Sequence, residues 1–244
     1  MFKGKYRIAE KSIEITSIYK KVHDYCMDYK SVEIPDFIVE TIQNDIELEK
    51  IKTKEEYTYE GLPVPNYTED VYELTAVYRK IAEKMPDYDS VVFHGSVISV
   101  DGQGYLFTAK SGTGKSTHTR LWREMLGDKA VMVNDDKPII KVTDEGVTVF
   151  GTPYNGKHRL GCNMSVPLKA ICILERGEKN TIKEISKSEA YAMLLQQVYR
   201  PKDPVQMTKT LKLIDKMAAN VGLYKLACNM DIEAAKVAYN AMKD

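Results

Sequence analysis

The segment from Thr108 to Trp122, TAKSGTGKSTHTRLW, has residue types and spacings that suit phosphate binding. A phosphate chain is held by backbone N–H groups, by the N-terminus of a helix and by a fixed cation. Gly112 and Gly114 allow the backbone to approach such a ligand closely and to adopt positive φ. Lys115 supplies the cation, and the hydroxyl of Ser116 is placed to hold Mg²⁺. The segment therefore predicts a nucleotide-phosphate loop between a strand and a helix.

One position departs from the usual GxxxxGK[ST] pattern, because Ala109 stands where that pattern has its first glycine. Alanine serves there if its φ is negative, so the departure weakens the pattern match more than the chemistry. The competing interpretation is a turn rich in glycine and serine that only caps a helix. The order of strand, GxGK[ST] and helix favours phosphate binding. The predicted nucleotide-binding residues are Ser111, Gly112, Thr113, Gly114, Lys115, Ser116 and Thr117.

A pair of carboxylates, Asp135 and Asp136, ends the apolar run VMVNDD, 20 residues after Lys115. An enzyme that transfers phosphate to a hydroxyl needs a carboxylate beside Mg²⁺ and a base near the attacking oxygen. Two adjacent carboxylates can divide these roles, since like charges held close together raise one pKa and favour a base. The alternative is a solvated turn, with which the neighbouring Lys137 is compatible.

A second group of cations follows in GTPYNGKHRLGCN, residues 151–163. Lys157, His158 and Arg159 lie there between glycines, where a mobile lid delivers cations to a transferring phosphoryl group. Ordinary solvated loop cations are the alternative. Arg159 is the preferred candidate because a guanidinium grips phosphate oxygens with two parallel hydrogen bonds. Arg176, at the end of ICILER, is a weaker one.

The elements that must position these residues follow from periodicity and turn signals. Residues 90–100, SVVFHGSVISV, are predicted as one strand, and DGQG at 101–104 as a hairpin turn. A second strand runs into the glycine loop, and a helix follows at 116–126. We expect an N-terminal α+β region at 1–85 and a kinase-like domain at 86–244, strand-rich in its middle and ending in helices.

The composition limits the classes of partner and location. The chain has 244 residues, with 35 Lys and Arg against 35 Asp and Glu, so no global field favours nucleic acid or an anionic membrane. Neither a signal sequence nor an apolar run long enough to span a membrane is present. The four cysteines are scattered and are expected to be reduced thiols of a cytoplasmic protein. A zinc site is not expected.

The order FHG, hairpin, SGTGKS, helix and NDD over residues 90–176 resembles the C-terminal kinase domain of the HPr kinase/phosphorylase family. The resemblance implies a mixed α/β fold, with a β-rich P-loop kinase core shared with phosphoenolpyruvate carboxykinases, C-terminal helices and a small N-terminal α+β part. By position, His94 matches the family's catalytic histidine, and Asp135 and Asp136 match its paired aspartates. Alone, a histidine beside a strand is more often structural.

These features predict an ATP- and Mg²⁺-dependent kinase that phosphorylates a serine-type hydroxyl of a protein, a peptide or a small metabolite. In this scheme Ser116 and Asp135 hold Mg²⁺, Asp136 is the base, His94 supports the site, and Arg159 or Lys157 completes it. Which aspartate is the base and which the ligand is left open, and a homo-oligomer is compatible with the resemblance. The alternatives are a nucleotide-dependent switch without an acceptor and, less favoured, a carboxykinase-like enzyme.

Overall fold

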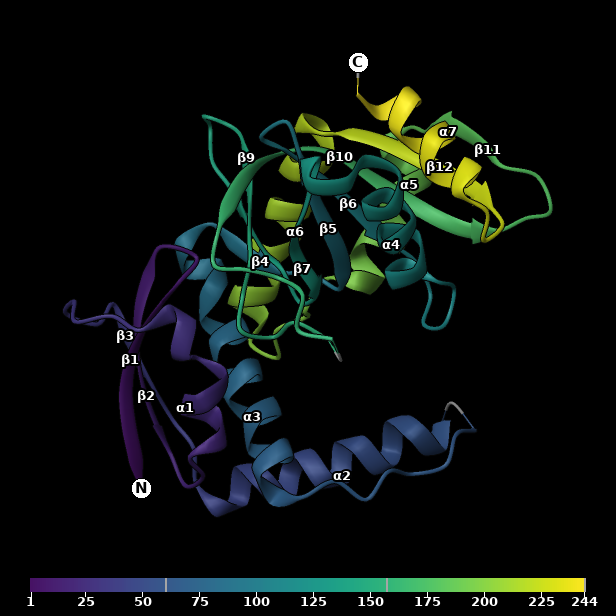
Figure 1. Cartoon of the computed structure of the whole chain (residues 1–244). Coiled ribbons are helices and arrows are strands. Elements are labelled where there is room, and N and C mark those ends of the chain that lie inside the picture. The colour runs from purple at the N-terminus through teal and green to yellow at the C-terminus, as the bar shows by residue number, and fades with distance from the viewer. Residues whose placement is uncertain (60, 157, 244) are drawn as a thin grey trace. The chain divides into compact units, whose positions relative to one another are not determined.

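The computed structural model describes residues 1–59, 61–156 and 158–243 and has a mixed α/β fold (Figure 1). Internal contacts divide the chain into two compact units, Met1–Lys84 and Met85–Asp244. In the described part of the chain, no helix is long and apolar enough to span a membrane.

The N-terminal unit is built on a small sheet in which β1 (Phe2–Ile8) pairs antiparallel with β2 (Lys11–Ser17), and β3 (Phe37–Glu40) lies parallel to β2. The buried carboxylate of Glu73 accepts hydrogen bonds from the backbone N–H groups of Ile18 and Tyr19, at 2.6 and 2.7 Å. The carboxylate therefore ties its helix to the loop after β2. The helices are α1 (Lys21–Tyr25), the 3₁₀ helix η1 (Met27–Tyr29), α2 (Gln43–Tyr59) and α3 (Glu69–Lys84).

The C-terminal unit contains a curled sheet in which β4, β8, β9, β10, β6, β5 and β7 lie in that order. Strand β12 also pairs with β10, and β11 pairs with β12. The long strand β10 joins the part of the sheet formed by β4, β8 and β9 to the rest, because its first residues pair with β9 and its later residues with β6 and β12. The strands are β4 (Ser90–Val92), β5 (Gly95–Val100), β6 (Gln103–Thr108), β7 (Ala130–Asp136), β8 (Ile139–Val142), β9 (Val147–Phe150), β10 (Ser165–Arg176), β11 (Thr181–Glu184) and β12 (Gly222–Cys228).

Strand directions bring several ends to one edge of this sheet. Strands β6, β10 and β12 are parallel, and β7 runs with β6 because both are antiparallel to β5. The register places Gly95 opposite Asp136, and Ile173 opposite Thr108. The C-terminal ends of β6, β7, β10 and β12 therefore meet the start of β5 at this edge, which is where ligands bind in sheets of this kind.

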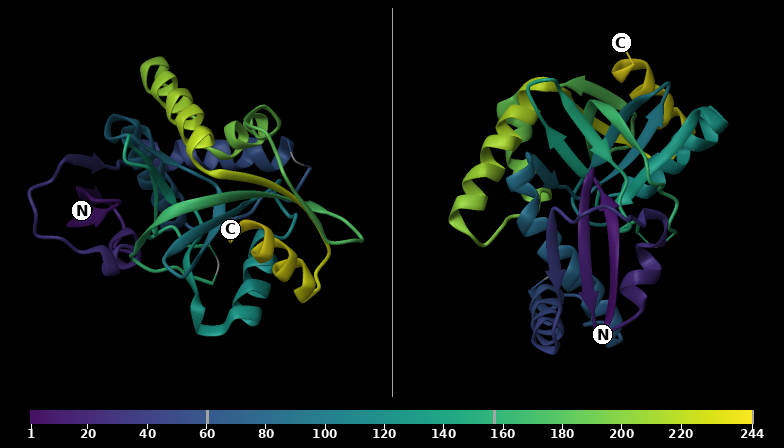
Figure 2. Two further views of the ribbon diagram at one scale, coloured as in Figure 1. Left: turned by 90° about the horizontal axis from the view of Figure 1, so that it is seen from above. Right: turned by 90° about the vertical axis from the view of Figure 1, so that its left-hand side faces the viewer.

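Helices cover both faces of the sheet around β6 (Figure 2, left). Successive residues of β6 point to opposite faces: Phe107 packs with Trp122 of α4, whereas Leu106 belongs to the core that holds Leu194 of α5 and Ile214 of α6. The helices are α4 (Lys115–Leu126) and α7 (Ile232–Met242) on the first face, and α5 (Lys187–Gln197) and α6 (Pro204–Asn220) on the second. The 3₁₀ helices η2 (Met85–Tyr88) and η3 (Gly127–Lys129) complete the unit.

The prediction of one strand over residues 90–100 is wrong. The structure has two strands there: β4 pairs with β8, whereas β5 pairs with β6 and β7. The break falls at Phe93, whose N–H donates to the carbonyl of Pro138 at 3.0 Å. Both strands are fully buried, so neither shows the alternation of buried and exposed residues, and periodicity does not reveal the break.

Candidate active site

The predicted phosphate loop connects β6, which ends at Thr108, to α4, which begins at Lys115. Gly112 and Gly114 have φ values of 71° and 118°, a region that other residues rarely adopt. Ala109 does not have positive φ and is fully buried, so an alanine fits where the usual pattern has glycine. The loop thus has the local geometry that its glycines predict, and its first residue does not distort it.

Lys115 stands at the first position of α4 and turns back over the loop. Its ammonium lies 3.4 Å from the carbonyl oxygen of Ala109. Burial lowers the pKa of Lys115, and the nearby positive charge of Lys137 lowers it further. The half-buried cation therefore lies over the loop, where an anionic ligand would relieve both effects.

The carboxylate of Asp135 accepts hydrogen bonds from two hydroxyl groups on neighbouring elements. The hydroxyl of Ser116 donates to its Oδ1 at 3.0 Å, and Ser96 of β5 donates to the same oxygen. The sheet register sets the second contact, because Ser96 lies opposite Asp135. In the part of the chain that the structure describes, no three His, Cys, Asp or Glu side chains form a metal cluster. Mg²⁺ bound with a nucleotide takes one or two carboxylates plus phosphate oxygens and water, so Asp135 and Ser116 are a donor set that fits it.

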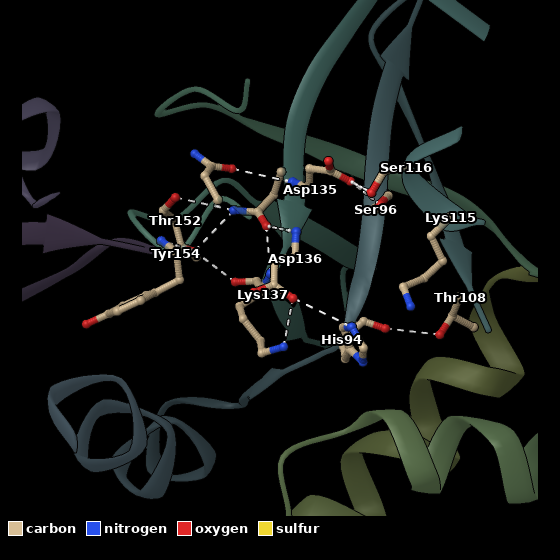
Figure 3. A network of polar contacts seen from close by, with 12 residues as sticks. His94, Ser96, Thr108, Lys115, Ser116, Asp135, Asp136, Lys137, Thr152 and Tyr154 are labelled. Atoms are coloured by element: carbon tan, nitrogen blue, oxygen red, sulfur yellow. Dashed lines mark hydrogen bonds and ion pairs between the residues drawn. The ribbon is translucent and has the colours of Figure 1, made fainter. Parts of the chain in front are cut away.

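Asp136 faces a different set of side chains (Figure 3). Its Oδ1 lies 2.8 Å from Nζ of Lys137 and 3.6 Å from Nε2 of His94. The backbone of His94 is fixed on both sides: its N–H donates to Gln197 at 2.7 Å, and its carbonyl accepts from Thr108 at 3.0 Å. The two adjacent aspartates thus have distinct partners, one toward the loop and one toward the histidine.

The imidazole of His94 is held in its neutral form. Burial lowers its pKa to about 4, and the charges of Lys137 and Lys115 act in the same direction. The carboxylate of Asp136 opposes this shift without reversing it. A neutral imidazole near pH 7 can accept or donate a hydrogen bond without adding charge.

The turn that carries the aspartates is ordered by Asn134, which is fully buried. Its side-chain oxygen accepts the N–H groups of Asp136 and Lys137, at 2.9 and 2.8 Å. Its amide donates to the hydroxyl of Thr152 at 3.1 Å, and that hydroxyl donates to the carbonyl of Lys137 at 2.8 Å. This buried network holds the aspartates in place, in contrast to the alternative of a freely solvated turn.

The loop after β9 reaches the aspartates through Gly156. A Cβ at Gly156 would lie 2.6 Å from the carbonyl oxygen of Asp135, and its φ is 49°, so glycine is required there. Lys157, predicted to complete the site, lies outside the described residues. Arg159 is exposed and has a φ of 48°.

Two further cations contact residues of the site. Lys137 pairs with Asp136, and a guanidinium nitrogen of Arg176 donates to the carbonyl of Gly112 at 2.7 Å. Sequence reasoning rated Arg176 below Arg159, and treated Lys137 only as part of a turn. It also missed Ser96, which lies two residues after His94, on the strand β5 that begins directly after it. That spacing was the available signal.

Comparisons with known proteins give one family. The sequence profile described as SynChlorMet cassette protein ScmC matches residues 62–234. No curated protein matches the chain. Among solved structures, the Hpr(Ser) kinase/phosphatase from Coxiella burnetii aligns over 62% of this chain and 95% of that chain, at 10% identity and a TM-score of 0.35. A TM-score this low does not establish a shared fold.

Proposed function

The chain belongs to the SynChlorMet cassette protein ScmC family, and we propose that it is a kinase that transfers the γ-phosphoryl group of ATP to a hydroxyl group. The acceptor hydroxyl belongs to a protein, a peptide or a small metabolite. Mg²⁺ accompanies the nucleotide.

One observation carries this proposal: two adjacent carboxylates beside the phosphate loop are separated into different environments. Asp135 contacts Ser116 at 3.0 Å, next to Lys115. Asp136 contacts His94 and Lys137 instead. A kinase needs one carboxylate for the metal and another for the acceptor, whereas a nucleotide switch has less use for a base.

These contacts support one division of the roles that the sequence left open. Asp135 and Ser116 would hold Mg²⁺, which would neutralise negative charge that develops during phosphoryl transfer. Lys115 and the N–H groups of the loop bind the phosphates. Asp136 accepts the proton of the acceptor hydroxyl, and neutral His94 beside it orients that hydroxyl or the carboxylate.

Lys137 adds a cation beside the same carboxylate. Its ammonium contacts Asp136, and it lies near enough to Lys115 and His94 to lower the pKa of each. A bound phosphate chain would supply the negative charge that this group of positive and neutral side chains lacks. The arrangement supports electrostatic stabilisation of the transferring phosphoryl group.

Acceptor-dependent transfer tests the proposal. The protein is incubated with Mg²⁺, ATP labelled at the γ-phosphorus and a panel of hydroxyl compounds: free serine, serine-containing peptides and folded proteins. We expect label in a phosphate ester of one class of acceptor, and little hydrolysis when no acceptor is added. Asp136→Asn should abolish most transfer. Asp144→Asn is the matched control, because the Asp144 side chain is 99% exposed and pairs with Lys216.

Two results would contradict the proposal. Steady ATP hydrolysis that no acceptor changes, without label transfer, would identify a nucleotide switch. Equal activity in the Asp136→Asn and Asp144→Asn variants would remove Asp136 from the chemistry.

A further inference from the structure

A cavity of about 680 Å³ opens on the side of the phosphate loop opposite the aspartates. The sheet order defines the two sides: β5 and β7 lie beside β6 on one side, and β10 and β12 lie beside it on the other. The residues that line the cavity come from the loop, α4 and the ends of β10 and β12, and include Gly114, Thr117, Leu121, Arg176, Cys228 and Met230.

The topology explains why a ligand site would form there. Strands β6, β10 and β12 are parallel, and Arg176 at the end of β10 lies opposite Cys228 at the end of β12. The segments that follow these strands therefore leave the sheet at one edge and enclose a crevice. Ligands of α/β proteins bind in such a crevice, outside the carboxyl ends of the strands.

The lining changes in character from one end of the cavity to the other. At the loop end it offers backbone of Gly112 to Gly114 and the hydroxyl of Thr117. Away from the loop it offers the apolar side chains of Leu121 and Met230. This order fits a molecule with phosphate at one end and a flat, largely apolar ring at the other, and the volume lies in the range of small-molecule sites.

Arg176 stands between these two ends. One guanidinium nitrogen is held by the carbonyl of Gly112 at 2.7 Å, which fixes the planar group at the border of the loop and the cavity. Guanidinium groups stack on aromatic rings as well as binding phosphate oxygens. From this position the guanidinium of Arg176 can either stack on a ring in the cavity or bind a phosphate oxygen at the loop.

The far wall is preorganised by Asn229. Its N–H donates to the side chain of Asn180 at 3.0 Å, and its amide donates to the carboxylate of Asp231 at 2.9 Å and to the carbonyl of Glu178 at 3.3 Å. The bonds to Asn180 and Glu178 join the segment after β12 to the segment after β10. A wall fixed before binding lowers the entropic cost of holding a ligand.

We infer that this cavity holds the ribose and base of the nucleotide whose phosphates the loop binds. The nucleotide then lies along the sheet edge, with its base over the ends of β10 and β12 and its terminal phosphate at β7 and β5. The inference rests on the proposed function, since it assumes that the loop binds a nucleotide. It assigns base binding to Arg176, Leu121, Cys228 and Met230, a role that the sequence analysis gave to none of them.

Chemical modification of Cys228 tests this placement without disturbing the cavity. Cys26 and Cys172 are buried, and Cys162→Ser removes the exposed thiol, so Cys228 becomes the reactive one. We expect ATP and adenosine to slow alkylation of Cys228 several-fold. Inorganic tripolyphosphate, which has the phosphate chain but no nucleoside, should leave the rate nearly unchanged.

A pair of surface substitutions gives a second test by calorimetry. Met230→Asn removes apolar surface from the cavity, and Ile232→Asn makes the same kind of change at an exposed residue outside its lining. Met230→Asn should raise the Kd of ATP by about fivefold to tenfold, because part of a methionine side chain no longer packs against the base. It should not change the Kd of tripolyphosphate, and Ile232→Asn should change neither.

The possible failures are distinct. If ATP and tripolyphosphate both bind but ATP does not protect Cys228, and the two asparagine variants behave alike, the nucleoside lies elsewhere and only this inference fails. If neither ATP nor tripolyphosphate binds the wild-type protein in the presence of Mg²⁺, the proposed function fails with it.

Discussion

The hydroxyl oxygen of Ser116 lies 3.0 Å from Oδ1 of Asp135, although 19 positions separate the two residues in the sequence. Ser116 belongs to the first turn of α4, and Asp135 to the end of β7. The contact therefore joins the phosphate loop to the strand that carries both aspartates. A hydroxyl and a carboxylate held together in this way are oxygen donors of the kind that Mg²⁺ prefers, and the proposed metal site rests on them.

Removing either member of this pair should weaken the response to Mg²⁺. We expect Ser116→Ala and Asp135→Asn each to raise the Mg²⁺ concentration needed for half-maximal transfer. The double variant should need little more Mg²⁺ than the single variant with the larger effect, because both side chains act on one ion. Titration of transfer activity with Mg²⁺ at fixed ATP measures this effect.

The exposed Asp144 provides the control for loss of a carboxylate. Asp144→Asn should titrate like the wild type. Additive effects of Ser116→Ala and Asp135→Asn in the double variant would mean that the two side chains act independently, and the shared site would be wrong.

Asp136→Asn should separate catalysis from nucleotide binding. Asparagine has nearly the same shape but cannot accept the acceptor's proton, so kcat should fall about 10²–10⁴-fold. The Kd of ATP should change little, since the contacts of Asp136 are with His94 and Lys137. Rapid-quench turnover and calorimetry measure the two quantities. A large loss of ATP affinity at near-normal kcat would assign Asp136 to the metal instead.

Much of this site was predictable because it depends on local sequence. The loop glycines, Lys115 and the aspartates follow from short motifs whose chemistry requires those residue types. The hairpin turn at Asp101 and Gly102 was also predictable, and β5 and β6 pair across it. In each case the structure-determining signal lies within a few residues of the element that it specifies.

The parts that were missed depend on contacts between distant segments. Ser96 reaches Asp135 only because β5 and β7 pair in one register. The separate contacts of the two aspartates likewise depend on Asn134, which sets the turn, and on the position of His94 between two fully buried strands. No local pattern reports a strand register, so sequence alone left the roles of Asp135 and Asp136 open.

Substitution of His94 should lower kcat/KM without changing the shape of the pH profile of kcat/KM. Burial and the charges of Lys137 and Lys115 lower the pKa of His94 to about 4, so the free enzyme carries a neutral imidazole from pH 5.5 upward. The pH profile of kcat/KM reports groups of the free enzyme. His94→Gln should therefore lower kcat/KM by a constant factor between pH 5.5 and 8. A limb near pH 6.5 that is present in the wild type and lost in the variant would contradict this.

His118 should make the fold sensitive to acid. His118 lies on α4 with its side chain buried, and its Nε2 accepts a hydrogen bond from the indole of Trp122 at 3.1 Å. Burial lowers the pKa of His118 to about 4, whereas the unfolded chain keeps a value near 6.5. Between these pH values the unfolded state binds more protons, so the free energy of unfolding falls as the pH falls from about 6.5 to about 4.

A comparison of variants isolates this contribution. Each unit of pKa difference corresponds to about 1.4 kcal/mol, so His118 should account for about 2–3 kcal/mol of the stability lost between pH 7 and pH 4.5. His118→Gln keeps an acceptor for Trp122 but does not titrate, and should lose that much less stability. The exposed His158 gives the matched control, and His158→Gln should follow the wild type. Urea unfolding at the two pH values measures the difference. Equal losses in all three proteins would show that protonation of His118 is not linked to unfolding.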